Sequence, residues 1–249
     1  MAAPEPLRRL RVIFPEGFSV AEMAERVGAV REIAIAKRGV TPRLTEAGYT
    51  RAVKAASPPA RFRRDARTGS LEGFLFPASY EFTQETRARE LVADQLATFR
   101  ERFAKVDLAY PRSKNLTPYD VLIIASMIEK ETAVASERRL VAAVIYNRLR
   151  NRMPLGIDAT LRYGFGIPGT ESLTQKAIDT DSPYNTRKRV GLPPTPIANP
   201  GLASLQAAAH PAHVDYLYYV RKPTSLRHYF TSSEGDFLRT VCEYGYACS

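Results

Sequence analysis

The sequence predicts an α+β fold: a pair of helices packed with a small antiparallel sheet and long proline-rich loops, beside a small N-terminal α/β lobe. Three observations support this prediction. Helical hydrophobic spacing recurs from residue 117 to about residue 149. Short alternating or aromatic segments, typical of strands, occur near both ends of the chain. Polar segments rich in proline occupy much of residues 182–201. We expect two domains: residues 1–68, a small lobe with a basic linker, and residues 69–249.

The N-terminal lobe is expected to begin with a short strand and to continue in helices. The strand is Leu10–Phe14, and a Pro-Glu-Gly turn follows it. Ser19 and Glu22 form a capping-box pattern that starts a helix, and Gly28 is expected to end it. The basic, proline-containing run 57–70 indicates a linker or an exposed loop. Further helices are expected over residues 30–38 and 45–56.

Between this linker and the centre of the chain we expect a loop, a short strand and a helix. Residues 71–82 are rich in aromatic side chains and are interrupted by Gly73 and Pro77, which predicts a loop leading into a strand. Glu72 in this segment is a second acidic candidate that no periodicity places. A helix is expected over residues 86–106, with its apolar side chains facing inward.

The helix that begins after Thr117 is the central element of the predicted fold. Thr117 is a suitable N-cap, Pro118 suits the first helical position, and the charge of Asp120 complements the helix dipole. A second helix, capped by Ser136 and running to about residue 149, should form an αα pair with it because the connection is short. The apolar residues of the first helix share one predicted buried stripe: Val121, Ile124, Ala125 and Ile128.

Glu131 continues that apolar stripe. At about 100° per residue it lies about 20° from Ile124, whereas Glu129 lies at the edge of the stripe. A buried carboxylate is unfavourable unless it is neutral or well paired, and burial raises the pKa of such a group. A raised pKa suits a catalytic acid near neutral pH, so Glu131 is the candidate catalytic residue. The alternative is a solvated glutamate or a salt-bridge partner in the last helical turn.

Beyond residue 150 we expect strands, loops and one short helix. Residues 155–163, which carry Asp158 and Thr160, predict a strand followed by a turn. Residues 182–186 and 191–201 predict polar loops stiffened by proline, and this stiffening lowers the entropy of a loop that holds a ligand. A short helix is expected over residues 202–209, and a β-hairpin over residues 216–220 and 228–230.

The composition limits the classes of function. The 249 residues are 45% hydrophobic and 25% charged, as in ordinary globular proteins. The 36 Lys and Arg against 26 Asp and Glu give a net charge of +10, which favours an anionic partner. No run of about 18 apolar residues occurs, and the first residues do not form a signal peptide. Cys242 and Cys248 could close only a short terminal loop, and the sequence does not decide whether they pair.

Several kinds of site are not indicated. The sequence has no Gly-x-Ser-x-Gly elbow, no phosphate-binding loop and no dinucleotide fingerprint. The basic residues are spread along the chain, so we expect no nucleic-acid partner. The spacing of His210 and His213 does not favour a metal site, and no cofactor is expected. A buried-face Glu131, an accessory Asp158 and loops carrying tyrosine, asparagine and proline suit a sugar ligand.

Separate motifs occur in a characteristic order over most of the chain, from about Phe14 to Phe230. They are Leu71–Pro77 (LEGFLFP), Ala125–Glu137 (ASMIEKETAVASE), Asn147–Leu149 (NRL), Ser182–Thr186 (SPYNT), Gly191–Pro194 (GLPP) and Ala207–Pro211 (AAAHP). This set resembles the motifs of the YceG-like endolytic murein transglycosylases (MltG).

The resemblance implies a lyase that cleaves the MurNAc–GlcNAc β-1,4 bond in nascent peptidoglycan and leaves 1,6-anhydromuramic ends. It places the family's catalytic glutamate at Glu131 and implies no cofactor or metal. The implied partners are peptidoglycan glycan strands and cell-wall synthases, and the implied location is the cell envelope, at the outer face of the cytoplasmic membrane. The implied substrate-binding residues are Ser126, Asp158, Thr160, Tyr184, Asn185, Thr186, Pro193 and Asn199.

The chain departs from the family pattern at several places. The usual N-terminal membrane helix and LysM-like module are not matched. Gly156 and Ala159 stand where the family usually has Gln and Pro, and Gly235 replaces a usual His. Two alternatives stay open. One is a lysozyme-like hydrolase, which needs a second carboxylate such as Asp158. The other is a non-catalytic peptidoglycan-binding module.

Overall fold

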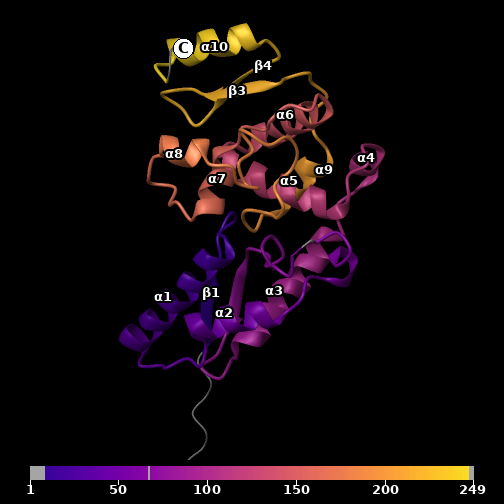
Figure 1. Ribbon diagram of the computed structural model, residues 1–249. Helices are drawn as coiled ribbons and strands as arrows, with labels where there is room; N and C mark the ends of the chain where they lie inside the picture. The colour runs from indigo at the N-terminus through magenta and orange to yellow at the C-terminus, as the bar shows by residue number, and fades with distance from the viewer. Residues whose placement is uncertain (1–8, 67, 247–249) are drawn as a thin grey trace, which may run out of the picture. The chain divides into compact units, whose positions relative to one another are not determined.

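The computed structural model describes residues 9–66 and 68–246, which divide into two compact units (Figure 1). Unit 1 contains the described residues up to Lys105 together with Ala198–Gly201, and unit 2 contains Val106–Ile197 and the residues from Leu202 onward. Each unit combines helices with one two-stranded antiparallel sheet, so the α+β prediction is confirmed for the described part of the chain. The units divide after Lys105 rather than after residue 68 because a strand and a helix beyond residue 68 pack into unit 1.

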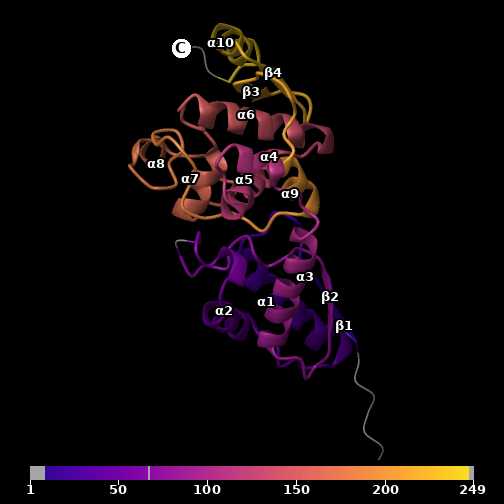
Figure 2. The same cartoon turned by 90° about the vertical axis from the view of Figure 1, so that its right-hand side faces the viewer.

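The sheet of unit 1 joins two segments that are far apart in its sequence. Strand β1 (Leu10–Ile13) pairs antiparallel with β2 (Ser79–Phe82), and Leu10 lies opposite Phe82. Alternate residues such as Val12 and Tyr80 are buried. Three helices complete the unit, α1 (Val20–Arg38), α2 (Glu46–Ala55) and α3 (Ala88–Phe103), and α2 contacts both of the others (Figure 2). The predicted first strand and the predicted loop leading into a strand are both confirmed.

Helix α1 (Val20–Arg38) is one continuous element where the sequence predicted two. Its capping box, Ser19 with Glu22, is confirmed. Gly28 does not end the helix. A Cβ at Gly28 would lie 2.8 Å from Glu46 Oε2, so this glycine allows close approach of α2 (Glu46–Ala55). The helix ends at Gly39, whose φ of 62° is the left-handed conformation that glycine accepts readily.

The basic run 57–70 contributes to the core of unit 1, in contrast to the linker or exposed loop that we predicted. It contains the 3₁₀ turn η1 (Ala60–Phe62), and the Phe62 side chain is buried. The ring of Phe62 packs edge-on against Phe74 at 5.1 Å and Phe103 at 5.0 Å. Phe103 belongs to α3 (Ala88–Phe103), so this aromatic cluster ties the run to the helix. The neighbouring arginines are exposed, which explains the linker-like composition.

The core of unit 2 is built on α5 (Pro118–Glu131), which packs against α6 (Arg138–Arg150) and α9 (Leu202–Ala209). The Thr117–Asp120 capping box and the complete burial of the predicted apolar stripe are confirmed. The αα pair is also confirmed. Ser136, however, does not cap α6: it lies within the 3₁₀ turn η2 (Ala135–Glu137), and Glu137 is the N-cap residue. A short helix, α4 (Ala109–Ser113), packs on α9.

Helix α7 (Asp158–Phe165) stands where the sequence predicted a strand and turn. Ile157, Thr160 and Leu161 are buried, and this i, i+3, i+4 spacing belongs to a helix rather than a strand. Asp158 lies in the first turn, where the helix dipole favours negative charge. Gly166, with a φ of 64°, ends the helix. A further short helix, α8 (Gln175–Asp179), follows.

The predicted hairpin of unit 2 is confirmed as β3 (Tyr218–Arg221) and β4 (His228–Thr231). Tyr219 lies opposite Phe230. Helix α10 (Glu234–Glu243) covers the hairpin, and Figures 1 and 2 both show the order α10, hairpin, α6 and α5 through the unit. Cys242 lies in α10, whereas Cys248 is outside the described residues. Over residues 9–66 and 68–246, none of the helices has the length and apolar character needed to cross a membrane.

Candidate functional site

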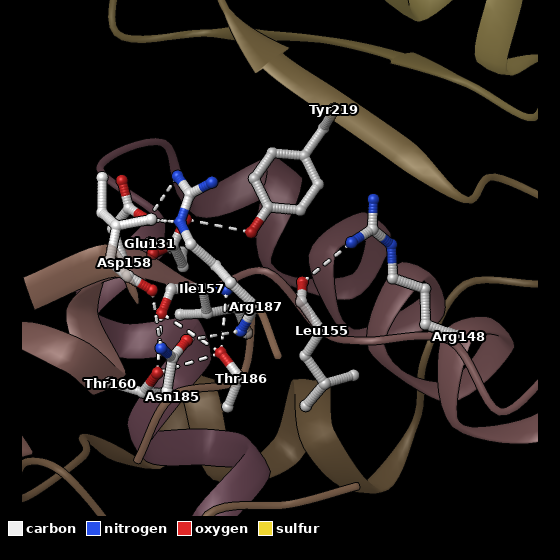
Figure 3. A network of polar contacts seen from close by, with 11 residues as sticks. Glu131, Arg148, Leu155, Ile157, Asp158, Thr160, Asn185, Thr186, Arg187 and Tyr219 are labelled. Atoms are coloured by element: carbon white, nitrogen blue, oxygen red, sulfur yellow. Dashed lines mark hydrogen bonds and ion pairs between the residues drawn. The ribbon is translucent and has the colours of Figure 1, made fainter. Parts of the chain in front are cut away.

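Glu131 is the last residue of α5, and its carboxyl group is held from across the unit. The Tyr219 hydroxyl of β3 donates a hydrogen bond to Glu131 Oε2 over 2.9 Å (Figure 3). Glu131 is half-buried, so part of its surface stays open to solvent. Burial raises the pKa of the Glu131 carboxyl above its usual range, although the hydrogen bond from Tyr219 acts in the opposite direction. The direction of the pKa shift of Glu131 therefore agrees with the sequence prediction, whereas its burial is only partial.

Three further charged groups act on this carboxyl. The negative charge of Asp158 adds to the rise in the pKa of Glu131, whereas the charges of His228 and Arg187 oppose it. Asp158 Oδ1 accepts from Arg187 Nε over 2.7 Å and lies 2.6 Å from Arg187 Nη2. Figure 3 shows this ion pair beside Glu131. The site thus combines one protonatable carboxyl with one ion pair and one phenol.

Three predicted site residues hold this arrangement together. Asn185 Nδ2 donates to Ile178 O over 2.9 Å and to Thr180 O over 2.8 Å, which orders the loop before Arg187. Thr186 Oγ1 accepts from Ile157 N over 3.0 Å and pairs with Thr160 Oγ1 over 3.0 Å. All three side chains are buried. The structure therefore brings Asn185, Thr186 and Thr160 together as supports for Asp158 and Arg187.

Tyr184, a further predicted site residue, is partly exposed and packs against another tyrosine. Its hydroxyl pairs with Thr195 Oγ1 over 2.8 Å, and its ring lies 5.4 Å from that of Tyr163 in α7. A Cβ at Gly164 would lie 2.6 Å from Tyr184 Cβ, so only glycine permits this close packing. These contacts hold Tyr184 against α7 and the proline-rich loop.

The remaining predicted residues lie elsewhere in the fold. Ser126 is fully buried and accepts from Ile197 N over 3.0 Å, which anchors the proline-rich loop to α5. Pro193 is buried in the same loop. Asn199 belongs to unit 1, where its Nδ2 donates to Glu72 Oε1 over 2.9 Å and its Oδ1 accepts from Leu75 N over 2.9 Å.

Glu72, the second acidic candidate, has a structural role at the start of α1. Its carboxylate is buried and accepts from Val20 N, the first residue of α1, over 3.1 Å. Negative charge at this position complements the dipole of α1. Glu72 and Asn199 therefore support the N-terminal end of a helix within unit 1.

The sequence did not identify several residues of the Glu131 site: Tyr219, Arg187, His228, Glu137 and Arg148. The alternation along the predicted hairpin places Tyr218 and Tyr219 on opposite faces, but it does not reveal which of the two faces meets α5. Arg148 lies in one of the quoted motifs, and its Nε donates to Leu217 O over 2.6 Å, just before β3. These residues come from separate segments, so only their meeting in the fold makes them recognisable.

A comparison with protein-family models matches residues 2–243 to the YceG-like family. The chain belongs to the YceG-like family. Its similarity extends to a solved member: the crystal structure of a putative YceG-like protein from Listeria monocytogenes superposes with a TM-score of 0.77 at 27% identity. That match covers 92% of this chain and 75% of the solved chain.

Relatives of this YceG-like chain carry a functional name. The endolytic murein transglycosylase of Streptococcus pneumoniae (strain D39) is 34% identical over 248 residues, which cover 92% of this chain and 44% of the relative. The endolytic murein transglycosylase of Bacillus subtilis (strain 168) is 34% identical over 177 residues, which cover 71% of this chain and 47% of the relative. The chain therefore spans less than half the length of these relatives.

Proposed function

We propose that this YceG-like chain is the catalytic part of an endolytic peptidoglycan lytic transglycosylase. Its substrate is the MurNAc–GlcNAc β-1,4 bond within a nascent glycan strand. The relatives named endolytic murein transglycosylase support the reaction class, and the Glu131 site supports the chemistry.

The proposed reaction uses Glu131 first as an acid and then as a base. The protonated carboxyl donates to the glycosidic oxygen as the bond to the anomeric carbon of the muramic acid breaks. The C6 hydroxyl oxygen of the same sugar then bonds to that anomeric carbon and returns its proton to the Glu131 carboxylate. The carboxyl is regenerated, no water is consumed, and a 1,6-anhydro ring closes the new end.

The observation that carries this proposal is the environment of Glu131. A carboxyl group must hold its proton near neutral pH to act as the acid, and burial raises the pKa of Glu131 in the required direction. The half-buried position keeps the group accessible to a substrate. One well-placed carboxyl is sufficient here, in contrast to the two that most glycosidases use.

A lysozyme-like hydrolase is the second candidate, because Asp158 lies near enough to affect the pKa of Glu131. A hydrolase needs this second carboxylate to activate water or to stabilise the sugar cation. Two guanidinium nitrogens of Arg187, Nε and Nη2, approach Asp158 Oδ1, so one of the two carboxylate oxygens of Asp158 is engaged in an ion pair. This engagement favours the reaction without water.

The proposed setting follows from the substrate. Peptidoglycan lies in the cell envelope, so we propose that the protein acts at the outer face of the cytoplasmic membrane and meets cell-wall synthases there. The net charge of +10 suits a polymer whose peptide stems carry carboxylates.

The test is a digestion of purified peptidoglycan in water enriched in ¹⁸O, followed by mass spectrometry of the released fragments. New 1,6-anhydromuramic ends without ¹⁸O are expected. Reducing ends that carry ¹⁸O would make the protein a hydrolase. Retained binding without any fragments would favour the non-catalytic binding module.

A further inference from the structure

We propose that Tyr219 is a positioning residue for Glu131, and that a buried Glu137–His228 pair holds Tyr219 in place. This inference rests on the proposed function, because it assigns a role within the same site. The β3–β4 hairpin then has a specific role, which is to orient the carboxyl group at the end of α5.

The contact between Tyr219 and Glu131 orients one oxygen of the carboxyl group. The Tyr219 hydroxyl donates to Glu131 Oε2 over 2.9 Å. No hydrogen bond to Oε1 of Glu131 is found among residues 9–66 and 68–246. The phenol therefore fixes Oε2, and the other oxygen stays available for proton transfer to a substrate.

The Tyr219 ring packs against two side chains of the neighbouring strand. Its centroid lies 5.3 Å from the ring of His228 at an interplanar angle of 84°, and 5.7 Å from the ring of Phe230. Both neighbours belong to β4, so the partner strand limits how far the Tyr219 ring can move. The edge-to-face contact with His228 adds directional preference to simple burial.

A buried pair of side chains holds β4 in turn. His228 Nδ1 lies 2.7 Å from Glu137 Oε2, and the backbone N–H of His228 donates to Glu137 Oε1 over 3.1 Å. The side chains of His228 and Glu137 are only 8% and 7% exposed. Removal of one member of a buried pair is strongly destabilising, so such a pair holds its geometry firmly. Glu137 occupies the N-cap position of α6, after the short connection that follows Glu131.

Groups from four segments act on the pKa of Glu131. They are Tyr219 on β3, His228 on β4, Asp158 on α7 and Arg187 in the loop after α8. The hydrogen bond from Tyr219 lowers the pKa of Glu131 because it stabilises the charged carboxylate. Removing the phenol hydroxyl should therefore raise this pKa further while the burial of Glu131 is retained.

The test compares wild type with Tyr219→Phe, using Tyr218→Phe as the matched control. Tyr218 is the preceding residue of the same strand and stacks on Phe237 of α10 instead. We expect Tyr219→Phe to lower kcat at least about 10-fold, as for loss of a hydrogen bond to a charged group. The alkaline limb of its pH–rate profile should move to higher pH. If the substitution only disturbed the structure, the rate would fall at every pH and the alkaline limb of the pH–rate profile would not shift.

The contribution of the buried pair is tested with a double-mutant cycle. If His228 acts through Tyr219, His228→Ala should lower kcat, and Tyr219→Phe should add little further loss in that background. Fully additive losses would contradict the proposed connection. Circular dichroism and melting temperatures identify any variant that fails to fold, and Phe230→Leu then replaces His228→Ala as the second probe of the ring packing.

An activity-independent measurement separates this inference from the proposed function. A ¹³C NMR titration of the glutamate carboxyls, with Glu131 assigned by its absence in Glu131→Gln, should show a higher pKa of Glu131 in Tyr219→Phe. An unchanged titration would overturn the positioning role even in an active enzyme. Wild-type protein that releases no fragments from peptidoglycan would instead overturn the proposed function, whatever the titration shows.

Discussion

Arg187 Nη2 lies 2.6 Å from Asp158 Oδ1, and this ion pair joins the start of α7 to the loop that follows α8. The two charges act on Glu131 with opposite sign: Asp158 raises its pKa and Arg187 lowers it. The pair therefore keeps one charge of each sign near the carboxyl. Loss of either partner unbalances the field at Glu131.

Neutral substitutions of this pair should move the pH–rate profile in opposite directions. Asp158→Asn removes a negative charge, so the pKa of Glu131 should fall and the alkaline limb should move to lower pH. Arg187→Gln removes a positive charge, so the limb should move to higher pH. Steady-state rates measured across the acid, neutral and alkaline range check both shifts.

Arg189→Gln is the matched control for this comparison. Arg189 lies in the same loop as Arg187 but forms its ion pair with Asp181, at 2.7 Å. Its profile should match that of wild type. If the Asp158 and Arg187 variants shift in the same direction, the electrostatic explanation of the site is wrong.

Glu131→Gln should stabilise the fold at neutral and higher pH. The folded-state pKa of Glu131 is raised, so the folded protein binds its proton more tightly than the unfolded chain does. Stability of the wild type therefore falls as pH rises through the window between the unfolded pKa, about 4.3, and the raised folded pKa. The Glu131→Gln variant carries a neutral amide at this position, so its stability does not fall in this way.

Melting temperatures of wild type and Glu131→Gln across pH check this sign. The stabilisation should be complete above the folded pKa of Glu131 and should disappear as pH falls below the unfolded pKa. A variant that is less stable than wild type at alkaline pH would show that the charged form of Glu131 supports the fold.

Phe62→Ala should destabilise unit 1 by about 3–5 kcal/mol, as for other aromatic residues truncated in a packed core. Phe62 contacts the rings of Phe74, Phe99 and Phe103. Urea unfolding followed by circular dichroism measures the loss. Arg64→Ala, at an exposed position of the same run, is the control and should change stability by less than about 0.5 kcal/mol.

Binding to peptidoglycan should weaken as salt is added. The net charge of +10 attracts an anionic polymer over a distance set by the Debye length, which falls from about 10 Å at 0.1 M salt to about 3 Å at 1 M. Sedimentation of the protein with insoluble peptidoglycan at both salt concentrations gives the bound fraction. Equal binding at both would show that contacts other than long-range charge dominate.

Much of the fold could be predicted because its elements carry local signals. The capping residues Ser19 and Thr117, and the apolar stripe that ends near Glu131, depend only on neighbours within a few residues. The failures arose where a local signal has a long-range cause. Gly28 does not end a helix but permits close approach of Glu46. Phe62 belongs to a core whose other residues lie far along the chain.

The candidate site was predictable only in part. Glu131 could be chosen from helix geometry because its position on the buried face follows from about 100° per residue. Tyr219 could not be chosen, because a hydrogen bond across 88 positions of the sequence leaves no periodic signal. Asn185 and Thr186 were predicted as substrate contacts, whereas their hydrogen bonds support neighbouring segments.

The central claim is that the Glu131 carboxyl performs the cleavage. The most direct measurement is the release of soluble fragments from purified peptidoglycan by wild type, Glu131→Gln and Glu129→Gln. Glu129 lies on the same helix and pairs with Arg138 at 3.7 Å, so it is a matched control for loss of one carboxyl. We predict fragments with 1,6-anhydromuramic ends from wild type and Glu129→Gln, and none from Glu131→Gln. Undiminished release by a folded Glu131→Gln variant would contradict the claim.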